Sequence, residues 1–481
     1  MRLQNAMRLL PLLLICASFT GCAVALGPGF SQPTRVAEVS ATSIEPTHIH
    51  VQVTDTLENV GNRGLDYLDV TLPGGPIFGT RDVSVAVEGK IVASGETRQE
   101  PGSSLRVPFV PKWRQGETKE ITFNYDLEPA REGRGVVATT SDGFYLASPN
   151  VFPFWETPLG PFAQGSLRAH TEELEVAVPA DFRVLALVHE QRSTRRGELV
   201  VHRFVWRGAT FPPYLIAGRY RERRIETQQG SFFFWTREPI DQAAAQMAAN
   251  HLSATIAIYE RLFGQVANHH PPIYIVETSA ELAAVEEATG NIAAASFPEG
   301  VLLDHDAVRL GVASEPVLDL ADYELAHTWF GWHVLPQPQA EILLGRGMAL
   351  CASILAAEAR GGPAGRQRQI AQFIATYDRV GSADKKPGLG AASDYTREEI
   401  RAKAFKAALF LISLEDVAGE DKFDRAVRRI LRVMAGREIG TDELRSAMES
   451  ETGQNLAPLF HAWLDHSGIP ADFRTRYAGA Q

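Results

Sequence analysis

The sequence has few cysteines, no excess of positive charge and no long apolar run. Three cysteines occur in 481 residues, and the formal net charge is −11 at pH 7. A phosphate-binding surface needs clustered basic residues, so this balance argues against a nucleic-acid partner. We find no Gly-x-Ser-x-Gly elbow, phosphate-binding loop or dinucleotide fingerprint in the sequence. With 45% hydrophobic and 22% charged residues, the composition is that of a globular protein, long enough for two or three domains.

The N-terminus has the pattern of a signal peptide. Two arginines precede Leu9–Ala17, an apolar stretch too short to span a bilayer. The following stretch, Ser18–Cys22, resembles a bacterial lipobox. We therefore expect residues 1–21 to be removed and Cys22 to carry lipid, which would anchor the protein to a bacterial membrane outside the cytoplasm. The alternative is a plain secretory signal with an incidental cysteine.

Two further expectations follow from the start of the mature chain. Residue 23 is alanine rather than the aspartate associated with inner-membrane retention, which favours the outer membrane. Residues 22–46 are rich in small residues and proline and lack periodicity, so we interpret them as a lipid anchor and tether. The remaining cysteine, Cys351, lies in an apolar helical run and is expected to be a buried thiol.

Periodicity divides the rest of the chain into three parts. Residues 47–225 show alternating segments with Gly and Pro between them, which predict an N-terminal all-β sandwich or saddle. From residue 226 onward, a helix over Asp241–Phe263 and short strands near 272–276 and 301–303 predict an α/β lobe. Residues 340–481 are mostly helical in pattern. The fold class is therefore α+β and multidomain.

The stretch Ala321–Gly331 carries the most chemical information. As a helix, it places Tyr323 and His327 on one face at i and i+4, with Glu324 beside them. This is the layout of the His-Glu-x-x-His zinc motif, in which the histidines hold the metal and the glutamate is general base. Here tyrosine stands at the first histidine position.

The stretch resembles the motif of the gluzincin zinc aminopeptidases of the membrane alanyl aminopeptidase and leukotriene hydrolase type, which reads much like His-Glu-Leu-Ala-His-x-Trp-Phe-Gly. The closing Trp463-Leu464 and Gly468-Ile469-Pro470 resemble the end of the same family's domain. This resemblance implies a β-domain followed by a thermolysin-like metallopeptidase-type domain over 226–481.

The family's third zinc ligand is a glutamate 19 positions after the second histidine, and Arg346 stands there in this chain. A catalytic zinc needs three protein ligands and an open position. His327 is retained, but a tyrosine phenol with a pKa near 10 is a poor ligand, and a guanidinium has no lone pair to give. We therefore expect no cofactor, and we expect Arg346 to pair with Glu324 where the family has metal.

Two other functional positions of the family also differ. The segment whose glutamate grips the substrate amine falls on residues 294–298, where Ser296 and Phe297 stand and Glu299 is out of register. The tyrosine that stabilises the reaction intermediate in the family corresponds to Ala404. The resemblance thus implies that metal, amine anchor and oxyanion donor are lost together.

Three functions remain open at this point. The first is a pseudopeptidase in the envelope that binds a peptide or a protein partner. The second is an active zinc metallopeptidase, an aminopeptidase with an atypical ligand set. The third is a structural envelope protein whose cleft is closed by Trp332 or Phe297. A rebuilt metal site would have to draw on other side chains, of which the candidates are Asp304, His305, Asp306, His333 and Glu341.

Overall fold

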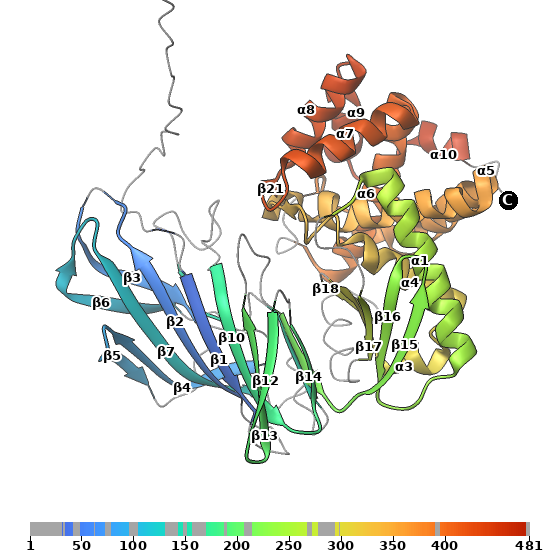
Figure 1. Ribbon diagram of the computed structural model, residues 1–481. Coiled ribbons are helices and arrows are strands. Elements are labelled where there is room, and N and C mark those ends of the chain that lie inside the picture. The colour runs from blue at the N-terminus through green and yellow to red at the C-terminus, as the bar shows by residue number, and fades with distance from the viewer. Residues whose placement is uncertain are drawn as a thin grey trace, which may run out of the picture.

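The computed structural model describes residues 31–477 except 32–33, 42–48, 62, 73–77, 96–103, 130–142, 148–151, 156–169, 187–189, 206–213, 267–271, 278–293, 298 and 390–394. Cys22 and the predicted signal peptide lie outside the described residues. Figure 1 shows a β-rich region on one side, helices on the other and a smaller sheet between them. The predicted fold class is confirmed.

The N-terminal β-domain is built around an eight-stranded sheet with the order β12-β13-β10-β1-β2-β7-β4-β5, accompanied by two three-stranded sheets, β11-β14-β8 and β6-β3-β9. The strands are β1 (Thr34–Ser40), β2 (Ile49–Glu58), β3 (Leu65–Thr71), β4 (Phe78–Val87), β5 (Lys90–Gly95), β6 (Ser104–Trp113), β7 (Thr118–Pro129), β8 (Gly143–Ala147), β9 (Phe154–Trp155), β10 (His170–Pro179), β11 (Arg183–Ala186), β12 (Glu190–Arg196), β13 (Leu199–Val205) and β14 (Tyr214–Gly218).

The alternating pattern of β7 has the expected consequence. Ile121, Phe123, Tyr125 and Leu127 are at most 1% exposed, because successive side chains of a strand point to opposite faces.

The predicted tether is wrong for part of its length, since Thr34–Ser40 forms β1 between β2 and β10. The buried face of β1 consists of Arg35, Ala37 and Val39, and an alternation that includes an arginine and an alanine was too weak a signal to predict a strand.

The second half begins with a five-stranded sheet of order β15-β16-β17-β19-β18. Its strands are β15 (Arg221–Thr227), β16 (Gly230–Thr236), β17 (Ile273–Glu277), β18 (Ala294–Phe297) and β19 (Gly300–Leu303). β15 contains the predicted boundary at 225/226, so the structural boundary lies a few residues earlier. β17 is parallel to β16 and β19, while β18 is antiparallel to β19 at one edge.

Helices make up most of the remaining chain. They are α1 (Gln242–Phe263), α3 (His305–Leu310), α4 (Glu315–Ala326), η1 (Pro338–Ala340), η2 (Glu341–Gly347), α5 (Met348–Val380), η3 (Gly381–Ala383), α6 (Arg397–Ala418), α7 (Glu420–Val433), α8 (Thr441–Thr452), α9 (Ala457–Leu464) and α10 (Ala471–Tyr477), with a small pair of strands, β20 (Leu335–Pro336) and β21 (Glu438–Ile439). α1 begins at the Asp241 cap and ends at Gly264, whose φ of 89° suits glycine, as the sequence predicts.

The five-stranded sheet contributes to both cores of the molecule. Phe232, Phe234 and Ile275 pack with the helices, whereas Trp235 and Val276 pack with the β-domain core. The sheet is therefore buried on both faces, and the β-domain is joined to the second half through an apolar contact.

Within the described part of the chain, one helical stretch, Pro338–Ala383, has the length and hydropathy of a membrane span. Its most apolar window is 78% buried inside the fold. Such burial is the property of a core helix.

Candidate functional site

The motif residues lie at the carboxyl end of α4. The helix ends at Ala326 and His327 is its C-cap, so the predicted helix over Ala321–Gly331 is too long by five residues. Gly331 has φ of 149°, and Trp332 N donates to His327 O at 3.0 Å as the chain turns back. Tyr323 and His327 nevertheless share a face, with ring centroids 4.9 Å apart and rings crossing at 81°.

A buried carboxylate that sequence reasoning missed holds α4 in place. Asp322 is 1% exposed. Its oxygens lie 3.0 Å from His251 Nε2 and accept from Thr255 Oγ1 at 2.7 Å and from Arg360 Nη2 at 2.6 Å. These partners come from α1 and α5, so Asp322 ties three helices together directly beside Tyr323. The sequence could have predicted this role, because an aspartate within the apolar face of a helix must find hydrogen-bond partners when it is buried.

Burial keeps both acid–base residues of the motif uncharged near neutral pH. Removal from water raises the pKa of Glu324 to about 8, although the positive charge of Arg346 acts in the opposite direction. Burial lowers the pKa of His327 to about 4, despite a hydrogen bond to Phe330 O. His327 Nδ1 lies 3.1 Å from that oxygen, so the neutral ring donates through Nδ1 and keeps its lone pair on Nε2.

Arg346 lies in an unusual backbone segment. Residues Glu341–Gly347 form a π-helix that leads into α5, and π-helical turns occur frequently at functional sites. Arg346 Nε donates to Glu341 Oε1 at 2.9 Å. Burial opposes the charge on Arg346, but Tyr323 and Glu341 outweigh it and raise the pKa.

The expected pairing of Arg346 with an ionised Glu324 therefore differs from what the structure shows. The carboxylate seated on the Nε of Arg346 is Glu341, which the sequence offered only as a metal-ligand candidate. Glu324 is 4% exposed and holds its proton. Glu341 Oε2 is buried and lacks a hydrogen-bond partner among the described residues.

The predicted substrate-binding residues lie at the edge strand β18. Ser296 Oγ accepts a hydrogen bond from Trp332 Nε1 at 3.2 Å, which links the edge strand to the turn after the motif. Phe297 is fully buried in the β-domain core. Glu299 lies in the turn between β18 and β19, where its carbonyl oxygen accepts from Tyr274 N.

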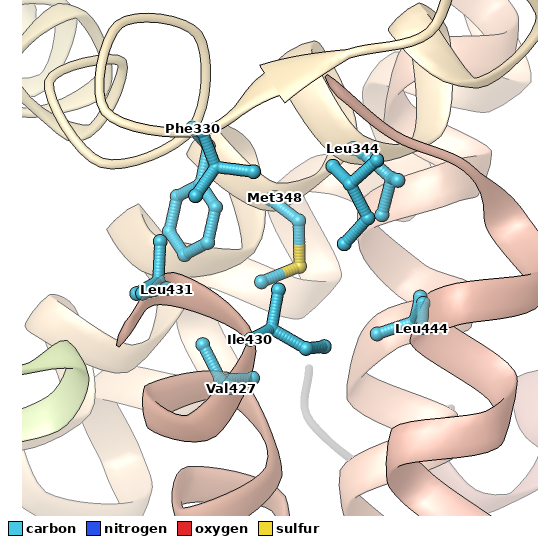
Figure 2. Close-up of a pocket in the computed structure, with 9 residues that line it drawn as sticks. Phe330, Leu344, Met348, Val427, Ile430, Leu431 and Leu444 are labelled. Carbon is cyan, nitrogen blue, oxygen red and sulfur yellow. The ribbon is translucent and has the colours of Figure 1, made fainter. Parts of the chain in front are cut away.

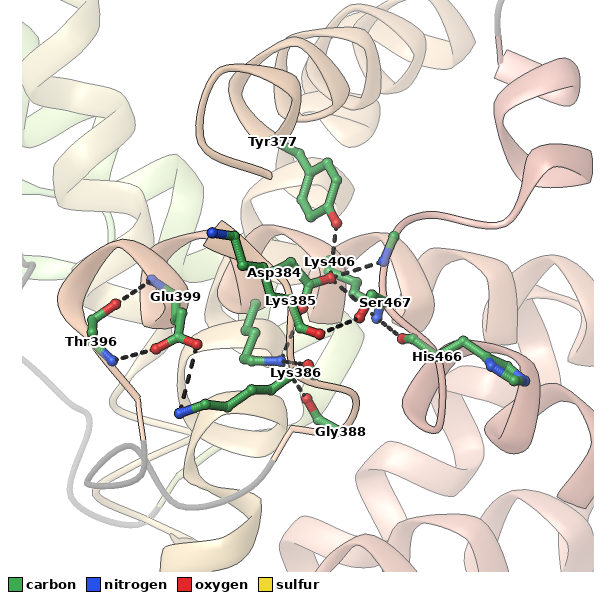
Figure 3. Close-up of polar contacts among 12 residues, drawn as sticks. Tyr377, Asp384, Lys385, Lys386, Gly388, Thr396, Glu399, Lys406, His466 and Ser467 are labelled. Atoms are coloured by element: carbon green, nitrogen blue, oxygen red, sulfur yellow. Dashed lines mark hydrogen bonds and ion pairs between the residues drawn. The ribbon is translucent and has the colours of Figure 1, made fainter. Parts of the chain in front are cut away.

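Ala404 is a buried residue of α6 and follows Lys403 in the sequence. Figure 3 shows the cluster of charged residues around Asp384 to which Lys403 belongs. Asp384 accepts from Tyr377 Oη at 2.8 Å, Lys403 Nζ at 2.9 Å and Lys406 Nζ at 3.4 Å. This cluster ties the end of α5 to α6 and the C-terminal turn. The nearest tyrosine upstream of Ala404 that the sequence offered, Tyr395, has its ring 4.5 Å from Lys403 Nζ, so it belongs to this cluster.

An apolar pocket lies between the π-helical segment and the C-terminal helices α7 and α8 (Figure 2). Side chains from the motif turn, the π-helix and the C-terminal helices line it, namely Phe330, Val334, Leu344, Met348, Val427, Ile430, Leu431, Ile439 and Leu444. Its volume of about 20 Å³ is that of one water molecule, and its lining offers no polar partner for one. We regard it as a packing gap rather than a substrate site.

The side chains at the motif do not fit a catalytic zinc. Among them, His327 has a suitable free nitrogen, the phenol of Tyr323 would have to ionise, and Arg346 cannot be a ligand. In the part of the chain that the structure describes, no group of three or more His, Cys, Asp or Glu side chains has metal-binding geometry.

The candidates for a rebuilt site are dispersed. His305 Nδ1 lies 2.6 Å from Glu277 Oε1 near the carboxyl ends of β19 and β17, and His333 Nε2 lies 3.1 Å from Leu431 O. Asp304 caps α3 through Ala307 N.

Comparison with known proteins finds a family match in the second half of the chain. Residues 248–463 are similar to the peptidase family M1 domain. No curated protein matches the chain.

Solved structures share the fold of this chain. The M1 zinc metallopeptidase from Deinococcus radiodurans has a TM-score of 0.63 and 19% identity, covering 92% of this chain and 95% of that one. Yeast LTA4 hydrolase has a TM-score of 0.64 and 14% identity, covering 92% of this chain and 69% of that one. The predicted resemblance to gluzincin aminopeptidases is confirmed for the fold and, over residues 248–463, by similarity to the M1 peptidase domain.

Proposed function

We propose that this protein is an M1-fold pseudopeptidase that uses its former active site to bind a peptide or a protein partner. The observation that carries the proposal is Arg346, a guanidinium bound to the Glu341 carboxylate at 2.9 Å, at the sequence position of a zinc ligand. A cation there opposes a second cation, and Tyr323 supplies no ready ligand in compensation. Loss of one ligand could be a variation of mechanism, but two changed ligands leave a single histidine for the metal.

We further propose that the protein acts outside the cytoplasm, attached to a bacterial membrane through Cys22. The lipobox-like sequence supports this location, and alanine at position 23 favours the outer membrane. Growth with radiolabelled palmitate would test it: we expect label in the wild type and none in Cys22→Ala. Label in both variants, or in neither, would contradict lipidation at Cys22.

Metal content is the direct test of lost zinc chemistry. Soluble protein starting after Cys22, purified without chelator, should contain far less than one zinc per chain by elemental mass spectrometry. The double variant Tyr323→His/Arg346→Glu restores the family's ligand set and should bind close to one zinc per chain. Zinc in the wild type at one per chain, removed by chelator together with aminopeptidase activity, would instead support the active metallopeptidase.

A structural envelope protein is the other function with specific support. Phe297 is fully buried, and Trp332 in the turn after the motif is hydrogen-bonded to Ser296 of the edge strand β18. A purely structural role predicts that neither metal nor peptide binds. Peptide binding separates the two proposals, and the tripeptide Tyr-Ser-Ala, a substrate seen with the D. radiodurans relative, is a suitable first probe.

A further inference from the structure

We propose that Glu341 is an internal substitute for a ligand's carboxylate: it occupies Arg346 in the free protein and is displaced when a peptide presents its terminal carboxylate. This inference deepens the proposed function and rests on it, because Arg346 must be available to a peptide rather than remote from the binding site. It assigns a ligand class, a carboxylate-terminated peptide, to the altered metal position.

The first argument is the chemistry of the pair. A guanidinium has five N–H donors in a planar fork, and it binds carboxylates in preference to other groups. Arg346 already binds one carboxylate in the structure, because its Nε donates to Glu341 Oε1 at 2.9 Å. The side chains of Arg346 and Glu341 are 19% and 33% exposed, so both are partly accessible to solvent rather than fully buried.

The second argument is that Glu341 is an incomplete occupant. Its Oε2 is buried and has no hydrogen-bond partner among the described residues. A buried carboxylate oxygen without a partner carries a desolvation cost. Since a third of the Glu341 side chain already reaches solvent, a rotation outward would return Oε2 to water and remove that cost. The internal carboxylate is therefore held less firmly than its short contact with Arg346 suggests.

The third argument is charge balance. If one carboxylate replaces another, Arg346 keeps its counter-charge throughout the exchange. A neutral or cationic ligand group would remove the Glu341 carboxylate from the partly buried guanidinium without replacing its negative charge, which is costly. Tyr323 and Glu324, from α4, also interact electrostatically with Arg346, and the phenol of Tyr323 can donate to a carboxylate oxygen. These groups together favour a carboxylate over an amine at this position.

The backbone around Arg346 suits such an exchange. Gly345 and Gly347 flank it within the π-helix. At Gly345 an added Cβ would lie in ordinary contact with Pro336 Cγ, at 3.5 Å. Glu341 is the first residue of the same segment and precedes α5, so its exchange with a ligand would involve the π-helix alone.

The test compares two probes and four proteins. The probes are N-acetyl-Ala-Ala-Ala with a free carboxylate and the same peptide as its C-terminal amide, titrated into soluble protein by isothermal calorimetry. The proteins are the wild type, Glu341→Gln, Arg346→Lys and Arg346→Met, each with its melting temperature measured to confirm folding. Glutamine keeps the size of Glu341 and an acceptor for Nε, but removes the competing charge.

We expect the free acid to bind at least about tenfold more tightly than the amide. Glu341→Gln should tighten binding of the free acid by about fivefold to tenfold, because the ligand no longer competes with an internal carboxylate. Arg346→Lys should weaken binding, since lysine lacks the planar fork. Arg346→Met should abolish the preference for the free acid over the amide.

Several results would overturn the inference. Equal affinity for acid and amide would remove the carboxylate from recognition. Weaker or unchanged binding by a folded Glu341→Gln would show that Glu341 supports the ligand or is uninvolved. Absence of binding in both the wild type and Glu341→Gln would also reject it. These outcomes differ from failure of the proposed function, which is read from stoichiometric zinc in the wild type.

Discussion

The protonation of Glu324 gives the sharpest test of the site's electrostatics. In the structure, burial raises the pKa of this carboxyl to about 8 from an ordinary value of 4.5. We consider the change Glu324→Gln, which keeps the shape of the protonated acid and removes the ability to ionise. The matched control is Glu315→Gln, the same substitution on the exposed first turn of the same helix.

The sign follows from proton linkage. Below pH 4.5 the carboxyl is protonated in both states, so it adds no pH dependence. Between pH 4.5 and about 8 the unfolded chain loses the proton and the folded chain keeps it, so the free energy of unfolding of the wild type falls as pH rises. Above pH 8 the carboxyl is ionised in both states, and the loss is complete.

The magnitude follows from the size of the shift. Each pKa unit corresponds to about 1.4 kcal/mol, so Glu324→Gln should gain up to about 5 kcal/mol over the wild type between pH 4.5 and pH 8. The side chain is almost fully buried, so solvent screening reduces this figure little. His327 does not enter, because it is present in both proteins and cancels in the difference.

The assay is urea unfolding followed by tryptophan fluorescence at pH 5, 6, 7 and 8. The difference in unfolding free energy between Glu324→Gln and the wild type should grow by about 1.4 kcal/mol per pH unit. Glu315→Gln should differ from the wild type by a small, pH-independent amount. A flat difference for Glu324→Gln would refute the reasoning, since it would mean that a cation, either a metal or Arg346, compensates the ionised carboxylate in the folded protein.

Two further predictions concern the framework around the site. Gly347→Ala should lower the free energy of unfolding by about 1–3 kcal/mol, because the new Cβ would lie 2.6 Å from Ala407 Cβ. The matched variant Gly345→Ala should be neutral or stabilising by up to about 1 kcal/mol. A similar loss of stability for both variants in thermal melts would contradict the packing argument. Asp384→Asn should lower the free energy of unfolding by about 3–5 kcal/mol, measured with urea, because Lys403 and Lys406, each at most 1% exposed, would lose their shared carboxylate. A loss below about 1 kcal/mol would show that backbone carbonyl groups alone stabilise the two buried ammonium groups.

Local sequence patterns were sufficient for most elements of the fold. The two-residue period of β7 and the capped apolar run of α1 depend on neighbours close in sequence, so they were readable directly. β1 was missed because its stability comes from pairing with β2 and with β10, whose partner residues lie more than 130 positions away. A strand held by distant partners has little signal of its own.

The identity of the site residues was also a property of the sequence alone. The spacing of Tyr323, His327 and Arg346 within a recognisable motif was enough to predict the metal-ligand positions and to predict that two of them carry other residues than the family's ligands. No structure is needed to know that a guanidinium cannot bind zinc.

Only the tertiary structure decided what these residues do with their charges. One partner of Arg346 is Glu341, and the two residues lie in a π-helical segment that the sequence did not predict. The pKa values of Glu324 and His327 are set by side chains packed around them from several helices, and Asp322 is stabilised by α1 and α5. Desolvation and ion pairing depend on the distances between atoms far apart in sequence, and those distances exist only once the chain has folded.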